Sequence, residues 1–245
     1  MTSRTKPSPL SFLWFLLLLT AMTLLLAGIA NRIATAETPT LHPTSTSPEV
    51  VILDAGHGGE DGGAVSGAGV PEKELNLAIA ALMETLLESN GVHTVMTRTE
   101  DILLYDRTQD YHGRKKALDL AARLAVGNQY PAGIFVSIHM NSYPLPQYHG
   151  LQVWYSPNHG TSQGIAEQMQ STVAATLQPE NDRCVKAAGS NIYLLHHLQC
   201  PAVLVECGFL SNPTEAERLS TPEYQRQLAL LLTLALMEYE NPTEK

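Results

Sequence analysis

The feature that most constrains the fold is an alternation of short apolar runs with longer amphipathic stretches, which fills the chain from Val50 onward. The short runs are rich in Val, Ile and Leu, as buried strands are, and the longer stretches carry apolar residues at helical spacing. This alternation predicts one α/β domain, with a mostly parallel or mixed twisted sheet and helices on both faces. We see no internal repeat.

We expect strands at residues 50–53, 92–97, 134–138, 151–155 and 202–205. Helices are expected at residues 72–88, 113–127, 161–177 and 224–239. In sheets of this kind, functional side chains gather where strands end and loops begin. The segments that follow these strands are therefore where a site is expected.

The first 36 residues resemble a signal or membrane-anchor segment. Arg4 and Lys6 precede an uncharged run, residues 10–30, that is long enough to span a bilayer as a hydrophobic helix. Positive charge before the run predicts that the rest of the chain lies outside the cytoplasm. Residues 34–36 read Ala-Thr-Ala, as before a signal-peptidase cut, so the segment is either an uncleaved membrane anchor or a secretion signal cleaved after Ala36.

Residues 37–49 are rich in Thr, Pro and Ser and predict an extended linker, so the domain is expected over residues 50–240. The net charge is −9, and the first 36 residues carry three cations and no acid, which leaves −12 for the remainder. An acidic domain is a poor candidate for binding nucleic acid, because phosphate binding needs a basic surface.

Three cysteines, Cys184, Cys200 and Cys207, are too few for a disulfide scaffold. They form no C-x-x-C pair of the kind found in cysteine zinc sites. A bridge from Cys184 to Cys200 is open outside the cytoplasm. Three buried small apolar side chains are the simpler interpretation.

The residues that carry chemistry follow three of the predicted strands. His57 lies in a Gly-rich turn after the first strand, His139 follows the third, and Glu206 follows the last. Two His and one Glu form a known catalytic zinc shell, and a further carboxylate is needed to move protons. A carboxylate at the end of an apolar strand is costly unless it is paired or catalytic, which makes Glu206 a candidate.

Glu72, at the start of the first predicted helix, is the remaining candidate. Chemistry alone ranks Glu72 only slightly above Glu74, because a first-turn glutamate can simply favour the helix dipole. The other histidines are expected to be ordinary surface or core residues: His42, His93, His112, His149, His159, His196 and His197. The chain has no H-E-x-x-H helix, no G-x-S-x-G turn and no Walker loop.

Taken together, these motifs resemble the zinc N-acetylmuramoyl-L-alanine amidases of the type-3 class. The matching segments, in order along the domain, are residues 53–59, 72–77, 97–98, 135–141 and 205–212. The resemblance implies that His57, Glu72 and His139 bind zinc and that Glu206 is the catalytic carboxylate, and it selects Glu72 over Glu74. Ala55 replaces a usual Pro and Cys207 a usual small apolar residue, and neither change removes a ligand.

The implied activity is hydrolysis of the amide bond between N-acetylmuramic acid and L-alanine in peptidoglycan. Asp54 and Asn141 would support the ligands or the substrate. Residues 110–120 and 192–195 are similar to the CwlD-like sporulation subgroup, which strips peptides so that spore-cortex lactam can form. The alternatives are a vegetative cell-separation amidase, another extracytoplasmic zinc hydrolase such as a wall-peptide carboxypeptidase, and a non-catalytic wall-binding module.

The segment that follows His139 is short. Some members of the family carry an inserted helix there that blocks the zinc site, and this chain leaves no room for one. We therefore expect control of the activity through expression, location or an activating partner protein.

Overall fold

The computed structural model describes residues 20, 22, 48–106, 108 and 111–239. Apart from residues 20 and 22, the predicted signal or anchor and its hydrophobic helix lie outside the described residues, as does the linker up to residue 47. No helix among the residues described here is long and apolar enough to cross a membrane. The described residues from 48 to 239 belong to one compact unit.

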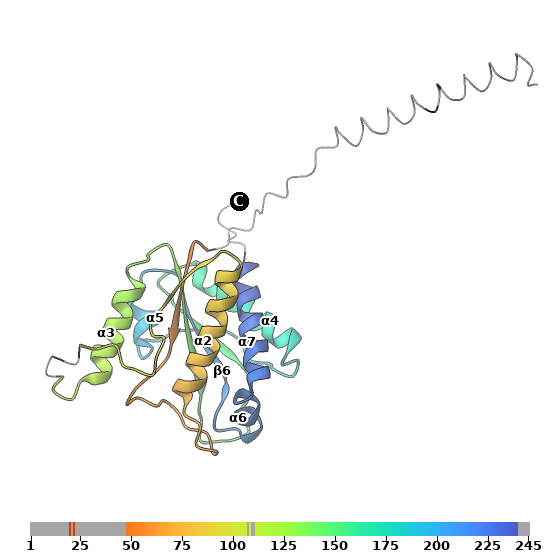
Figure 1. The fold of residues 1–245 in the computed structure, drawn as a ribbon. Helices are drawn as coiled ribbons and strands as arrows, with labels where there is room; N and C mark the ends of the chain where they lie inside the picture. Colours follow the sequence, from red (N-terminus) through yellow and green to blue (C-terminus); the bar gives the residue numbers. More distant parts are fainter. Residues whose placement is uncertain (1–19, 21, 23–47, 107, 109–110, 240–245) are drawn as a thin grey trace, which may run out of the picture. The chain divides into compact units, whose positions relative to one another are not determined.

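A six-stranded mixed sheet forms the centre of this unit (Figure 1). Its strands are β1 (Val50–Ala55), β2 (His93–Met96), β3 (Ile134–Asn141), β4 (Gln152–Tyr155), β5 (Lys186–Ala187) and β6 (Ala202–Phe209), and their spatial order is β2-β1-β3-β6-β4-β5. Strands β2, β1, β3 and β6 are parallel, and β4 is antiparallel to β6. The predicted α/β sheet is confirmed in its mixed form, and the carboxyl ends of β1, β3 and β6 meet at one edge.

Helices cover both faces of the sheet, as predicted (Figure 1). One face packs against α2 (Glu72–Ser89), α4 (Thr161–Thr176) and α7 (Pro222–Met237). The opposite face packs against α3 (Lys115–Gly127) and the short α5 (Tyr193–His197). A further short helix, α6 (Pro213–Leu219), follows β6.

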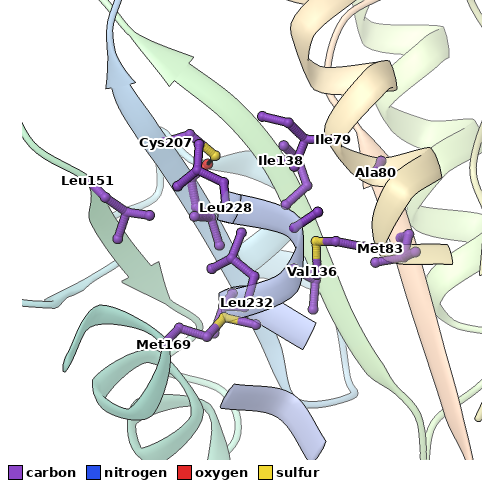
Figure 2. Close-up of a cluster of buried hydrophobic side chains, with 14 of the residues drawn as sticks. Ile79, Ala80, Met83, Val136, Ile138, Leu151, Met169, Cys207, Leu228 and Leu232 are labelled. Atoms are coloured by element: carbon purple, nitrogen blue, oxygen red, sulfur yellow. Dashed lines mark hydrogen bonds between the residues drawn. The ribbon is translucent and has the colours of Figure 1, made fainter. Parts of the chain in front are cut away.

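The larger hydrophobic core lies on the α2, α4 and α7 face (Figure 2). Met83 of α2, Met169 of α4 and Leu232 of α7 are fully buried there against strand residues such as Val136. Each fully buried side chain of this size contributes roughly 1.5–3 kcal/mol by leaving water. This packing fixes α2, whose first residue is Glu72, against the ends of the strands.

Strands β3 and β6 run further than the apolar pattern predicted. His139 and Glu206 lie inside these strands and face each other as Cα partners, whereas we expected both to follow the strands. The prediction was wrong because the backbone ladder forms whatever the side chains are, so polarity does not end a strand. The ladder is irregular between His139 and Asn141, as at a β-bulge.

Three short elements, β5, α5 and α6, were not predicted. The start of α6 does carry a sequence signal, because Asn212 accepts hydrogen bonds from the backbone of Thr214 and Glu215 and Pro213 follows it. A similar Thr221-Pro222 pair begins α7 two residues before the predicted start. Capping residues would have placed both helix starts where hydrophobic periodicity did not.

The cysteines only partly match the expectation. All three are free thiols, so Cys184 and Cys200 are not bridged. Cys200 and Cys207 are buried in the two hydrophobic clusters, whereas Cys184 is exposed. The expectation of three buried side chains was therefore wrong for Cys184.

Candidate metal and catalytic site

A buried carboxylate, that of Glu72, lies between the two histidines singled out from the sequence. Its Oε2 is 3.3 Å from Nε2 of His57, and its Oε1 is 2.9 Å from Nδ1 of His139. It also accepts hydrogen bonds from the backbone N–H groups of Ala64 and Met140, each at 2.9 Å. The three side chains each offer a ligand atom, and these atoms lie within 4.8 Å of one another, so the group could hold a metal ion.

The structure separates Glu72 from Glu74, which the sequence chemistry alone did not. Glu72 is buried and faces both histidines, whereas Glu74 is exposed on the outer side of α2. The six other histidines that the structure describes are absent from any cluster that could hold a metal ion, and His42 lies outside the described residues. The predicted set of His57, Glu72 and His139 is thus brought together.

The backbone around His57 lets the His57 and His139 rings lie close together. His57 itself has a φ of 61°, a left-handed conformation that is strained for a residue with a side chain and is often found at functional sites. A Cβ atom on Gly56 would lie 2.2 Å from Nε2 of His139. The His139 ring fills the space that a side chain at residue 56 would occupy.

Glu206 lies on β6 directly opposite His139 and is half-buried. Its Oε2 atom is buried and has no hydrogen-bond partner among the described residues. Burial raises the pKa of Glu206 to about 7. The charge of Glu72 also raises this pKa, whereas the charge of His139 lowers it. A carboxyl group with such a pKa can accept and release a proton near neutral pH.

Asp61, which the sequence analysis did not single out, supports His57. Its Oδ2 is 2.9 Å from Nδ1 of His57, the ring nitrogen that faces away from Glu72. Although burial opposes the effect, the contact with His57 lowers the pKa of Asp61, which favours its ionised form. A carboxylate on the outer nitrogen of a ligand histidine fixes the orientation of the ring. The sequence signal that could have identified Asp61 is an acidic residue four positions after a histidine in a Gly-rich turn.

Asp54 supports the site less directly than we predicted. It is buried and accepts hydrogen bonds from Thr97 (2.7 Å), Ser137 (2.6 Å) and Arg123 (2.7 Å), and it does not bond either histidine ring. Burial acts against ionisation, but Arg123 and these hydrogen bonds hold the pKa of Asp54 below its usual value. Arg123 in turn donates to the backbone carbonyl of His57 at 2.6 Å, so Asp54 is linked to His57 through Arg123.

The side chain of Asn141 does not support the candidate ligands, and its role toward the substrate stays a prediction. It lies at the end of β3, beyond the irregularity in the ladder. Its backbone carbonyl accepts a hydrogen bond from Leu210. In the described part of the chain, no hydrogen bond joins its side chain to His57, Glu72 or His139.

Two arginines hold the backbone that leads to His57. Arg98 donates to the carbonyl oxygens of Ala55 (2.8 Å) and Gly56 (3.0 Å), and Arg123 also donates to that of Ala55 (2.8 Å). Arg123 is fully buried and bonds Asp119 as well. Sequence reasoning missed Arg123 and included Arg98 only as part of a matching segment, because the backbone carbonyls that both arginines bond lie far away along the chain.

Three of the four candidate residues line one cavity of about 240 Å³. His57, His139 and Glu206 line it, and α3 and α5 contribute residues such as Lys116 and Tyr193. Two imidazole nitrogens and a carboxylate oxygen are a suitable donor set for a divalent metal ion in a hydrolytic site. The arrangement can therefore combine a metal ion with an adjacent carboxyl group.

Known proteins resemble the chain over this whole domain. A family model described as N-acetylmuramoyl-L-alanine amidase matches residues 51–238. The germination-specific N-acetylmuramoyl-L-alanine amidase of Bacillus subtilis is 33% identical over 193 residues, which cover 79% of this chain and 80% of that protein.

Solved structures resemble the fold as well. The CwlD amidase from Clostridioides difficile, solved in complex with the GerS lipoprotein, matches with a TM-score of 0.74 and 34% identity over 78% of this chain and 98% of that one. The amidase AmiC2 of Nostoc punctiforme matches with a TM-score of 0.66 and 29% identity over 78% of this chain and 96% of that one.

The buried Arg123 yields a test of how the site is supported. Replacing Arg123 with Met leaves the carboxylates of Asp54 and Asp119 buried without their cation, so we expect the free energy of unfolding to fall by about 3–5 kcal/mol. Denaturant titration measures this change. Arg226→Met, which breaks an exposed ion pair with Glu223, is the matched control and should change stability by less than about 1 kcal/mol. Equal stability of the two variants would contradict the role given to Arg123.

Proposed function

Because the chain belongs to the N-acetylmuramoyl-L-alanine amidase family, we propose that His57, Glu72 and His139 bind a catalytic zinc ion and that Glu206 transfers the protons. As a member of this family, the chain hydrolyses the amide bond between N-acetylmuramic acid and L-alanine in peptidoglycan. One observation carries the proposal. The buried carboxylate of Glu72 lies between two histidine nitrogens, with Glu206 on the neighbouring strand.

The residues of the chain would act as follows. When bound, a zinc ion supplies Lewis-acid chemistry that polarises a carbonyl group and lowers the pKa of water. Glu206 accepts a proton from the attacking water and delivers it to the L-alanine nitrogen as the carbon–nitrogen bond breaks. The products are the lactyl carboxylate of muramic acid and a peptide with a free L-alanine amine. Asp61 keeps the His57 ring in place throughout.

The setting that we propose is the spore cortex, outside the cytoplasm. The germination-specific relative and the similarity to the CwlD amidase support this setting. No helix forms between β3 and β4, over residues 142–151, where a blocking helix would have to lie. We further propose that the domain, residues 50–240, is secreted or anchored in the membrane through residues 1–36 and the linker. The lipoprotein bound to CwlD supports an activating partner protein.

Substitutions in the site separate metal binding from proton transfer. Glu206→Gln removes the proton-transfer group but no proposed ligand, so it should keep one zinc ion per chain and lose about 10²–10⁴ in rate on peptidoglycan. His57→Ala should lose both the zinc ion and the activity. Metal analysis of the purified variants, together with release of peptide amines, measures both effects.

Glu74→Gln is the matched control, since Glu74 lies two residues from Glu72 but is exposed. It should leave zinc content and activity close to those of the native chain. Loss of zinc from Glu206→Gln would make Glu206 a ligand and refute the assignment of roles. Full activity of metal-free protein would refute the zinc proposal.

The spore-cortex setting is tested in a spore-forming host that lacks this gene. If the enzyme strips peptides from cortex muramic acid, the spores should lack muramic lactam and germinate poorly, while vegetative cells separate normally. Cortex composition by mass spectrometry and germination assays measure the outcome. Chains of unseparated cells with an ordinary cortex would instead support the cell-separation alternative.

A further inference from the structure

A row of polar side chains crosses the sheet from the metal site toward β5. Glu206 on β6 faces His139 on one side and Gln152 of β4 on the other, as Cα partners. Side chains of directly opposed residues share one face of a sheet. Gln152 is buried, and its Oε1 accepts a hydrogen bond from Nη2 of Arg183 at 2.8 Å. A single side chain therefore separates the guanidinium group of Arg183 from Glu206.

Arg183 is held in place without an anionic partner. Its guanidinium carbon lies 4.8 Å from the centre of the Phe209 ring, and its backbone N–H donates to Asn181. Its Nε is buried and has no hydrogen-bond partner in the described part of the chain. Nor does any carboxylate of the described residues form an ion pair with Arg183, in contrast to Arg123. Because Nε is buried, it is closed to an external ligand. Nη1 of this half-buried guanidinium makes no hydrogen bond in the described part of the chain, so it is the donor available to an external carboxylate.

A second cation lies further along the same edge of the sheet. Lys186 of β5 pairs with Trp154 of β4, and its Nζ lies 5.5 Å from the centre of the Trp154 ring. Trp154 is two residues from Gln152 and so shares its face of the sheet. Arg183 and Lys186 are therefore two cations on this side of the sheet, in a chain whose net charge is −9.

The charge of the substrate is divided unequally between its two halves. The glycan carries no charge beside the scissile bond, because the lactyl carboxyl of muramic acid is part of the amide. The peptide begins with L-alanine followed by D-glutamate, which is joined to the next residue through its side-chain carboxyl. The α-carboxylate of D-glutamate is therefore free unless the cell amidates it, and it is the anion that lies nearest to the scissile bond.

The spacing between strands is comparable to the distance from the scissile bond to this carboxylate. Neighbouring strands are about 4.8 Å apart, and one extended residue spans about 3.5 Å. A carboxylate one residue beyond the scissile bond, with that bond beside Glu206, thus comes within reach of a guanidinium that lies just beyond Gln152. We propose that Arg183 is a specificity-determining residue that binds the α-carboxylate of the second stem-peptide residue, so that the peptide lies across β4 and β5.

This assignment rests on the proposed function, and a pair of substrates tests it. Both are muramoyl peptides on the same short glycan, one with D-glutamate and one with D-isoglutamine, which has a carboxamide in place of the α-carboxylate. The full native chain should cleave the D-glutamate substrate with a kcat/KM roughly 10- to 100-fold higher, as expected for a charge-assisted hydrogen bond. Arg183→Met should abolish this preference by losing rate on the D-glutamate substrate only, and Arg183→Lys should restore part of it.

Arg218→Met is the matched control. Arg218 also packs on an aromatic ring, that of Tyr224 at 4.6 Å, so its loss reproduces the loss of stacking. This variant should keep the native preference, and Arg183→Met should keep its bound zinc.

Several results would overturn the assignment. Equal rates of the native chain on the two substrates would do so even if Arg183→Met failed to fold. An equal loss on both substrates in Arg183→Met would make Arg183 a structural residue. Cleavage of neither substrate by the zinc-loaded native chain would overturn the proposed function, and this assignment with it.

Discussion

The site depends on the pairing of the buried Glu72 carboxylate with two histidines. A buried charge is costly unless it is paired, and Glu72 is paired by two histidines and two backbone N–H groups. Against the effect of burial, the hydrogen bonds from His139 and His57 hold the pKa of Glu72 far below its usual range. These contacts join the loop after β1, the start of α2 and the end of β3, so one side chain fixes three separate segments relative to one another.

A second set of buried charges supports this arrangement by bonding the backbone at and before His57. Asp54 and Asp119 both bond Arg123, which reaches the carbonyl of His57. Arg98 bonds the two carbonyls that precede His57. Hydrogen bonds from Arg123 of α3 and from Arg98, which follows β2, therefore hold the left-handed backbone at His57. Such support suits a site in which a ligand must be held at one fixed position.

Sequence reasoning reached the sheet and the candidate ligands because both have local signals. Apolar runs marked the strands, and a Gly-rich turn marked His57. On chemistry alone it ranked Glu72 only slightly above Glu74, since both lie in the first turn of α2 and only the packing of that helix buries one of them. Asp61 was overlooked despite its nearness to His57. Sequence reasoning could not identify Arg123 and Arg183, because the fold brings them close to residues that are distant in the sequence.

The position of the metal tests the account most directly. Crystals of the zinc-loaded chain, measured at the zinc absorption edge, would locate the ion by anomalous scattering. We predict one strong peak bounded by Nε2 of His57, Nδ1 of His139 and the carboxylate of Glu72, within about 2.0–2.2 Å of each ligand atom. A fully loaded crystal whose peak lay elsewhere, for example beside Cys184 or His197, would contradict it.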